Sequence, residues 1–291
     1  MSALGRSLHM LSQQHTVGSR MTQADRKRAW QRFAAQLEQG GYKLPKAHSL
    51  KPKHVDFLVN SWLDRHEAGE LKIGHIKNDM AHLRAWAKCV GKADIIPRKN
   101  NEIGIGDRDS SNENKARTLD LKQVEALPCQ RMQLATRLMA AFGLRQEEAL
   151  KFTPSKTKWL GDRIGIIVGT KGGRYREIPI LSDKQRALLE NAKEVAGGGS
   201  LIPPDKSYKQ FLNAYCYQKK KAGIMHVHGL RHHYAQVRYK MMTGRPCPRA
   251  DNPNYNAMTP NERGRDEAAR WQVSSELGHG RIYVTTTYLG G

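Results

Sequence analysis

Apolar residues in the first third of the chain recur at helical spacing in three separate stretches. The first stripe follows the i, i+3, i+4, i+7 pattern after Thr22 and stops at Gly40, and the others run over residues 53–66 and 73–90. Its apolar positions are Trp30, Phe33, Ala34 and Leu37. We therefore predict a small bundle of three helices over residues 21–97. Residues 1–20 show no useful periodicity and are predicted to be a flexible lead.

Residues 98–117 interrupt this periodicity and divide the chain. The segment is rich in Asn, Gly and Ser and has no apolar stripe, which is typical of an exposed linker. Helical spacing returns after Asp120, so we predict a second domain over residues 118–291. Its predicted helices cover about 130–142, 145–152, 183–195 and 206–222.

Strand-like alternation replaces helical spacing at residues 163–181. Ile164 and Ile166 precede a Gly-rich, basic turn at 170–173, and Ile178 and Ile180 follow it, which predicts a β-hairpin. The overall prediction is a mainly α fold with a small antiparallel β-sheet, of the α+β class. Regular β-α alternation, GxxxxGK[ST] and a GxGxxG after a strand are all missing from the sequence, so an ATP-binding fold has no support.

The charge of the chain favours a polyanionic partner. Among 291 residues, 49 Lys and Arg face 27 Asp and Glu, for a net charge of +22. Residues 1–105 carry 18 basic against 9 acidic side chains and residues 106–291 carry 31 against 18, so both parts are basic. Nucleic acid fits this balance, because binding releases condensed counterions; a lysine-rich soluble surface is the plainer alternative.

Other classes of protein are disfavoured by composition. No apolar run approaches the ~18 residues that a membrane span needs, and residues 1–20 lack a secretory signal. The four cysteines never form CxxC, which argues against a zinc finger or a disulfide framework and fits a reducing cytoplasm.

Four short stretches carry candidate chemistry. They are Gly-Leu-Arg-Gln-Glu-Glu at 143–148, Thr-Lys-Gly-Gly-Arg-Tyr-Arg at 170–176, His-Gly-Leu-Arg-His at 228–232, and Leu-Gly-His at 277–279 with Tyr288 nine residues after His279. Each stretch alone has an ordinary structural explanation, such as a surface arginine, a solvated hairpin lysine or a packed tyrosine.

Together and in this order, the four stretches resemble the tyrosine recombinase (phage integrase) family over residues 118–291. That family carries GxRxxE, a hairpin lysine in TKxxxxR, HxLRH, and LGH followed by a tyrosine. The resemblance implies an N-terminal helical core-DNA-binding domain of the SAM-like type over residues 21–97, a linker at 98–117, and a catalytic domain over 118–291. An inserted loop is expected at about 243–266, where it contacts DNA or a neighbouring protomer, or is a tolerated surface insertion.

The residue types suit phosphoryl transfer. The non-bridging oxygens of a phosphodiester gain charge in the transition state, and the guanidinium groups of Arg145 and Arg231 supply planar donors for them. The phenol of Tyr288 can form a covalent phosphate ester.

The resemblance adds further roles. Lys171 becomes the general acid, His228 supports proton transfer or binds the phosphate, His279 bonds a non-bridging oxygen, and Glu148 orients His228 or the arginines. The basic side chains expected to contact DNA are Lys77, Arg84, Lys88, Arg174, Arg176, Lys219, Lys220 and Lys221.

The implied reaction is site-specific recombination. Tyr288 attacks a strand to give a 3′-phosphotyrosine, and exchange proceeds through a four-way junction without ATP, metal or other cofactor. The expected partners are double-stranded DNA recombination sites, a homo-tetramer on two duplexes formed from monomers or weak oligomers, and accessory DNA-bending or excision factors. The expected setting is a mobile element in a bacterial cytoplasm, associated with the nucleoid.

Three alternatives stay open at this stage. Tyr283 is a rival nucleophile, although its distance from His279 does not match the family's spacing. His226 and His228 have the His-hydrophobic-His form of metal-dependent nicking relaxases, which attach to a 5′ end. The chain can also be a catalytically idle DNA-binding or architectural module.

Overall fold

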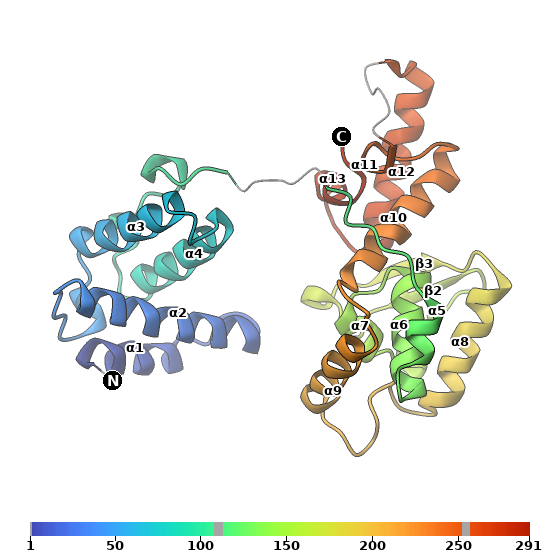
Figure 1. The fold of residues 1–291 in the computed structure, drawn as a ribbon, viewed down its shortest axis with the longest axis horizontal. Coiled ribbons are helices and arrows are strands. Elements are labelled where there is room, and N and C mark those ends of the chain that lie inside the picture. Colours follow the sequence, from blue (N-terminus) through green and yellow to red (C-terminus); the bar gives the residue numbers. More distant parts are fainter. Residues whose placement is uncertain (1, 108–112, 252–256) are drawn as a thin grey trace. The chain divides into compact units, whose positions relative to one another are not determined.

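The computed structural model describes residues 2–107, 113–251 and 257–291, in two units that divide between residues 111 and 112 (Figure 1). The N-terminal unit contains α1 (Ala3–Gln14), α2 (Arg20–Gln39), α3 (Pro52–Glu67) and α4 (Ile73–Cys89), with 3₁₀ turns at Ala47–Ser49, Ala93–Ile95 and Asn101–Ile103. None of the helices in the described residues is both long enough and apolar enough to cross a bilayer.

Helix α1 corrects the expectation of a flexible lead. Leu4, Leu8 and Leu11 form an i, i+4, i+7 stripe that is buried against α2. The side chain of Ser2 caps the helix by accepting a hydrogen bond from the Gly5 backbone at 3.1 Å. The stripe is too short to stand out in the sequence, and such a short helix depends on tertiary packing, which α2 and the 3₁₀ turn at Ala47–Ser49 provide.

The core of the N-terminal unit is built around three buried tryptophans. Each indole N–H has an acceptor: Trp30 donates to the His82 carbonyl at 2.9 Å, Trp62 to Gln36 Oε1 at 3.2 Å and Trp86 to the Ala47 carbonyl at 3.1 Å. These bonds satisfy the indoles inside an apolar core.

Part of the predicted linker belongs to this core. Ile105 is only 1% exposed and packs within the N-terminal cluster, and the 3₁₀ turn Asn101–Ile103 precedes it. The start of the predicted 98–117 linker is therefore packed structure and not an exposed connection.

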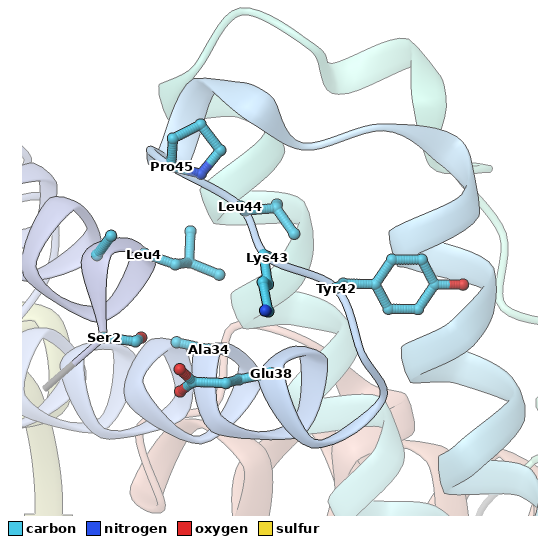
Figure 2. Close-up of a pocket in the computed structure, with 9 residues that line it drawn as sticks. Ser2, Leu4, Ala34, Glu38, Tyr42, Lys43, Leu44 and Pro45 are labelled. Atoms are coloured by element: carbon cyan, nitrogen blue, oxygen red, sulfur yellow. The ribbon is translucent and has the colours of Figure 1, made fainter.

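A shallow hollow opens beside the end of α2 (Figure 2). Apolar Leu4, Ala34 and Leu44 line it together with the charged Glu38 and Lys43. None of the four motif stretches contributes to its lining.

The C-terminal unit is mainly helical with one small sheet, as predicted. Its elements are α5 (Leu121–Glu125), α6 (Gln130–Phe142), α7 (Gln146–Leu150), β1 (Lys158–Trp159), β2 (Arg163–Ile166), β3 (Arg176–Pro179), α8 (Asp183–Ala196), α9 (Tyr208–Lys221), α10 (His228–Thr243), α11 (Pro248–Asp251), α12 (Pro260–Glu276), the 3₁₀ helix Ile282–Thr285 and α13 (Thr286–Leu289). The predicted hairpin is confirmed by the antiparallel pairing of β2 with β3, in which Ile164 faces Ile178. Strand β1, which was not predicted, extends the sheet in the order β1-β2-β3.

Helix α10 is the centre of this unit and packs against α6, α12 and α13 (Figure 1). Where α6 ends, Gly143 adopts a left-handed conformation with φ of 59°, and a Cβ there would stand 2.6 Å from the Tyr234 ring of α10. Glycine is therefore required both by the backbone angle and by the close approach of the two helices. This approach brings the end of α6 to the start of α10.

The predicted loop at 243–266 is partly helical. Helix α10 ends at Thr243, α11 covers Pro248–Asp251, and α12 begins at Pro260 with the Thr259 side chain as its cap. Asp266 is buried, where it accepts hydrogen bonds from the Tyr239 hydroxyl and from Arg270 Nε. The end of the predicted insertion is thus part of the core, while residues 252–256 lie outside the described residues.

Leu8→Ala should destabilise the N-terminal unit by about 2–5 kcal/mol, because it leaves a cavity at a fully buried position. Urea unfolding followed by the fluorescence of the buried tryptophans measures the change. Met10, on the same helix but 58% exposed, is the control, and Met10→Ala should cost less than about 0.5 kcal/mol. Equal, small effects of both changes would show that α1 is not packed on α2.

Candidate active site

Arg231 lies at the centre of the candidate site, in the first turn of α10. Its side chain is fully buried, and its guanidinium reaches backbone carbonyls at the ends of two other helices. Nη1 donates to the Gly143 carbonyl at 2.5 Å, and Nη2 donates to the Leu277 carbonyl. The fold therefore fixes this cation between the end of α6 and the end of α12.

Arg145 reaches the same place from the start of α7. Its Nη2 donates to the Leu277 carbonyl at 3.3 Å, the carbonyl that Arg231 also uses. Its Nη1 donates to Glu148 Oε1 at 2.7 Å, and its backbone N–H donates to Glu148 Oε2 at 2.6 Å. The shared carbonyl and the carboxylate together hold the second guanidinium beside the first.

Glu148 is a buried carboxylate that braces two arginines. Arg176 of β3 donates to both of its oxygens, from Nη1 at 3.0 Å and from Nη2 at 2.7 Å, and its Nε donates to the Glu276 carbonyl at 2.8 Å. Burial alone would raise the pKa of Glu148, but the hydrogen bonds and charge of Arg176, followed by those of Arg145, outweigh it and lower the pKa to about 2. Glu148 therefore stays ionised and holds Arg145 and Arg176 in place. Of the two roles expected from the sequence, orienting His228 or orienting arginines, these contacts fit the second.

The expectation that Arg176 contacts DNA needs correction. Its side chain is 2% exposed and is held by Glu148 and by a backbone carbonyl. Positions 176 and 178 of β3 are the buried ones, and Arg176 therefore points into the protein with Ile178. It stabilises the site from inside.

Tyr288 brings a phenol to Arg231 and His279. It is 4% exposed on α13, and its hydroxyl lies 3.2 Å from His279 Nε2 and 3.4 Å from Arg231 Nε. His279 Nε2 lies in turn 3.3 Å from Arg231 Nη2. The phenol, an imidazole and a guanidinium thus meet at a single point.

The turn after α12 sets the position of His279, and burial together with nearby arginines sets its charge state. Ser274 Oγ donates to the His279 carbonyl at 2.9 Å, which fixes this turn. Desolvation, followed by the charges of Arg231 and Arg145, lowers the pKa of His279 to about 4. The imidazole is therefore neutral at pH 7.

The rival nucleophile lies in a different environment. Tyr283 is 61% exposed in the 3₁₀ helix that precedes α13, and its hydroxyl accepts a hydrogen bond from Arg281 at 2.8 Å. Only Tyr288, among the two tyrosines, contacts His279 and Arg231.

Two histidines of α10 have their rings near the ring of Tyr288. The ring of His228 lies 6.1 Å from the Tyr288 ring, and its pKa is lowered by desolvation and then by Arg231 and Arg145. His232 ends the His-Gly-Leu-Arg-His stretch but was given no role in the recombinase chemistry, yet it is 3% exposed and its ring is 4.5 Å from that of Tyr288. The i, i+4 spacing from His228 could have predicted this shared helix face.

The structure shows no contact of the other basic candidates of this unit with Arg231 or Tyr288 among the side chains that it describes. Lys171 is in the turn between β2 and β3, but its side chain falls outside the described part of the chain. In the same unit, Lys219 Nζ donates to Gln146 Oε1 at 3.4 Å. Arg174, Lys220 and Lys221 are exposed, and a DNA contact by these lysines and Arg174 stays a prediction.

The three basic candidates of the N-terminal unit differ in their contacts within the protein. Lys77 pairs with Asp107 at 2.9 Å, and Arg84 donates twice to the Pro97 carbonyl, at 3.1 and 2.9 Å. Lys88 is exposed. A DNA contact remains a prediction for these three residues.

Two sequence-family matches cover most of the chain. Residues 1–96 match the family described as phage integrase, N-terminal, and residues 112–237 match the family described as integrase. The chain belongs to the tyrosine recombinase (phage integrase) family. No curated protein matches the recombinase significantly by sequence.

Solved structures share the fold of this recombinase. A lambda integrase dimer bound to a COC' core site matches with a TM-score of 0.56 at 16% identity, covering 98% of this chain and 75% of that one. XerH recombinase bound to difH gives 0.58 at 14%, covering 98% and 80%. The Tn1549 transposon integrase in complex with circular intermediate DNA gives 0.57 at 16%, covering 100% and 96%. At these identities the likeness establishes the fold.

Glu148→Gln should destabilise the recombinase by about 3–5 kcal/mol, because it leaves the buried Arg176 without its carboxylate. Urea unfolding followed by circular dichroism measures the change. Glu147→Gln is the matched control, since that half-exposed carboxylate pairs with Lys151 at the surface and should cost less than about 1 kcal/mol. A loss from Glu148→Gln no larger than that of the control would mean that the carboxylate does not brace the arginines.

The low pKa of His279 predicts a pH dependence of stability. Between the ordinary histidine pKa of 6.5 and the folded value of about 4, the unfolded chain binds a proton that the folded chain excludes. The free energy of unfolding should therefore fall as the pH decreases through this range. His279→Gln should make the fall shallower, as measured by urea unfolding at several pH values. An unchanged slope in the variant would show that His279 titrates normally in the folded protein.

Proposed function

We propose that this recombinase cleaves and rejoins DNA at specific sites, with Tyr288 as its nucleophile. The observation that carries the proposal is the position of the Tyr288 hydroxyl, within 3.4 Å of both His279 and Arg231. Cationic donors and the attacking oxygen would then contact the same phosphate.

The cleavage step transfers a phosphodiester from DNA to the enzyme. Tyr288 Oη attacks the phosphorus, the bond to the 5′ oxygen breaks, and that oxygen leaves with a proton supplied by Lys171. The products are a 3′-phosphotyrosine and a free 5′ hydroxyl, with His228 assisting the transfer of the phenol proton. A 5′ hydroxyl of a partner duplex then attacks the ester, which reverses the chemistry and rejoins the strands. The energy of the broken bond is kept in the ester, so no ATP is consumed.

Arg145 and Arg231 stabilise the transition state in this proposal. Both guanidinium groups are held in place before substrate arrives, so little reorganisation is required when charge develops on the non-bridging oxygens. A neutral His279 donates a hydrogen bond to one of these oxygens. Arg231 has its pKa lowered to about 10 by burial, which still leaves it charged at pH 7.

Double-stranded DNA is the substrate that the charge and the family support. The net charge of +22 favours a polyanion, and the structural relatives include a lambda integrase tetramer bound to a Holliday junction. We therefore propose a homo-tetramer on two duplexes, assembled on recombination sites, with accessory bending or excision factors. A bacterial mobile element, acting in the cytoplasm at the nucleoid, is the setting we infer.

The two other readings of the sequence are less favoured. A relaxase would use His226 and His228 with a metal ion and would leave the arrangement of Arg145, Arg231 and His279 unexplained. Among the described residues, no three His, Cys, Asp or Glu side chains gather as metal ligands. An idle architectural module would not require a tyrosine at the arginine pair.

Tyr288→Phe should abolish the covalent protein–DNA adduct and retain DNA binding, because only the attacking oxygen is removed. The substrates are duplexes selected by binding from a randomised pool, each nicked at a different position across the bound site. Denaturing gels detect the adduct of the wild-type protein in EDTA, and electrophoretic shifts measure binding.

Tyr283→Phe is the control, and its adduct should form at the wild-type rate. Loss of the adduct in Tyr283→Phe alone would reassign the nucleophile. A wild-type adduct that forms only with added metal would favour the relaxase chemistry, and complete absence of an adduct would favour the idle module.

A further inference from the structure

The first described residues of the C-terminal unit, 113–117, lie against the start of α10; we call them the strap. The backbone N–H of Arg117 donates to the Gly229 carbonyl at 3.0 Å. A Cβ at Gly229 would stand 2.6 Å from Arg117 Cγ and 2.7 Å from the Lys115 carbonyl oxygen, so only glycine admits this approach. The strap is therefore seated on the helix that carries His228 and Arg231.

Gln236, two turns along α10 from His228, joins the strap to Tyr288. Its Nε2 donates to Asn114 Oδ1 at 2.9 Å and to the Tyr288 backbone carbonyl at 3.1 Å. Its Oε1 accepts a longer bond from Asn114 Nδ2, at 3.4 Å. Gln236 is 9% exposed, so water cannot readily replace a lost partner.

A second bridge runs in parallel through α11. Arg249 Nη2 donates to the Thr286 carbonyl at 3.3 Å, and its Nη1 donates to the Glu113 carbonyl at 3.5 Å. Thr286 is the first residue of α13, and the strap begins at Glu113. Two side chains thus contact the strap on one side and the tyrosine-bearing helix on the other.

These outside contacts matter because α13 is short. The helix has four residues, Thr286–Leu289, and a single turn cannot hold itself in place through its own hydrogen bonds. The position of Tyr288 therefore depends on the groups that bond to the α13 backbone, among them Gln236 and Arg249.

We propose that Gln236 is a positioning residue through which the strap sets the place of Tyr288 in the active site. The inference rests on the proposed function, because it assumes that Tyr288 is the nucleophile. Asn114 of the strap bonds to Gln236, so a shift of the strap acts first on this amide pair. Gln236 transmits that shift to the Tyr288 carbonyl.

A double-mutant cycle on the full chain tests this coupling. The rate of adduct formation is measured at saturating nicked DNA, with the duplexes used for Tyr288→Phe, and the affinity for the same DNA is measured separately. Gln236→Ala should slow adduct formation about tenfold, and Asn114→Ala about threefold, as expected for lost hydrogen bonds at a buried amide. The double variant should match Gln236→Ala alone, because the two residues act in series.

Two further variants separate positioning from general destabilisation. Asn114→Asp keeps the acceptor for Gln236 Nε2 and should restore nearly the wild-type rate. Gln133→Ala is the matched control, since it removes hydrogen bonds from a side-chain amide to the Leu127 and Glu125 carbonyls at the end of α5 and should leave the rate unchanged. If Gln236→Ala fails to fold, the contrast between Asn114→Ala and Asn114→Asp decides the question.

The inference is overturned if the effects of Asn114→Ala and Gln236→Ala multiply, if they lower affinity in place of rate, or if Asn114→Asp is as slow as Asn114→Ala. An adduct that forms normally in every variant also overturns it and leaves the proposed function intact. Failure of the wild-type protein to form any adduct would instead remove the proposed function, and the inference with it.

Discussion

A buried cation without a carboxylate partner is the constraint on which the rest of the site depends. Arg231 is fully buried, and its hydrogen-bond partners are neutral: the Gly143 and Leu277 carbonyls, His279 and Tyr288. Among the described residues, no carboxylate forms an ion pair with it. Burying a charge in this way is costly unless an opposite charge completes the site. A phosphate would supply that charge, so the fold holds a position that the substrate is suited to fill.

The charged groups around Arg231 keep the electrostatic potential at the phenol positive. Arg145 and Arg176 also lower the pKa of His279 and contribute to that of Arg231. Glu148 holds both of these arginines, and its low pKa keeps it ionised wherever the protein is folded at ordinary pH. The carboxylate thus offsets the charge of the buried, structural Arg176 and holds Arg145 beside Arg231, where both guanidinium groups lie near the phenol.

The sequence predicted which side chains meet at the site better than it predicted the residues that hold them in place. Arg145, Arg231 and Tyr288 could be identified because their types and order match one family and because each stretch is short and local. The role of Arg176 could not, since a basic hairpin looks solvated until the register of β3 shows that position 176 faces inward. Helix α1 was missed for a related reason: a short stripe such as that around Leu8 becomes a helix only through packing on α2, and sequence spacing does not report that partner.

The same contacts explain how a one-turn helix can carry the tyrosine that we propose as the nucleophile. The Tyr288 hydroxyl lies against Arg231 and His279, the groups that a phosphate would also need. Substrate therefore competes with the tyrosine for these donors, and the phenol must shift relative to Arg231 while staying close enough to attack. A long, internally rigid helix would resist such a shift. A short α13, held at its backbone by side chains from α10 and α11, adapts more readily, while the burial of Tyr288 and Leu289 in the core keeps such a shift small.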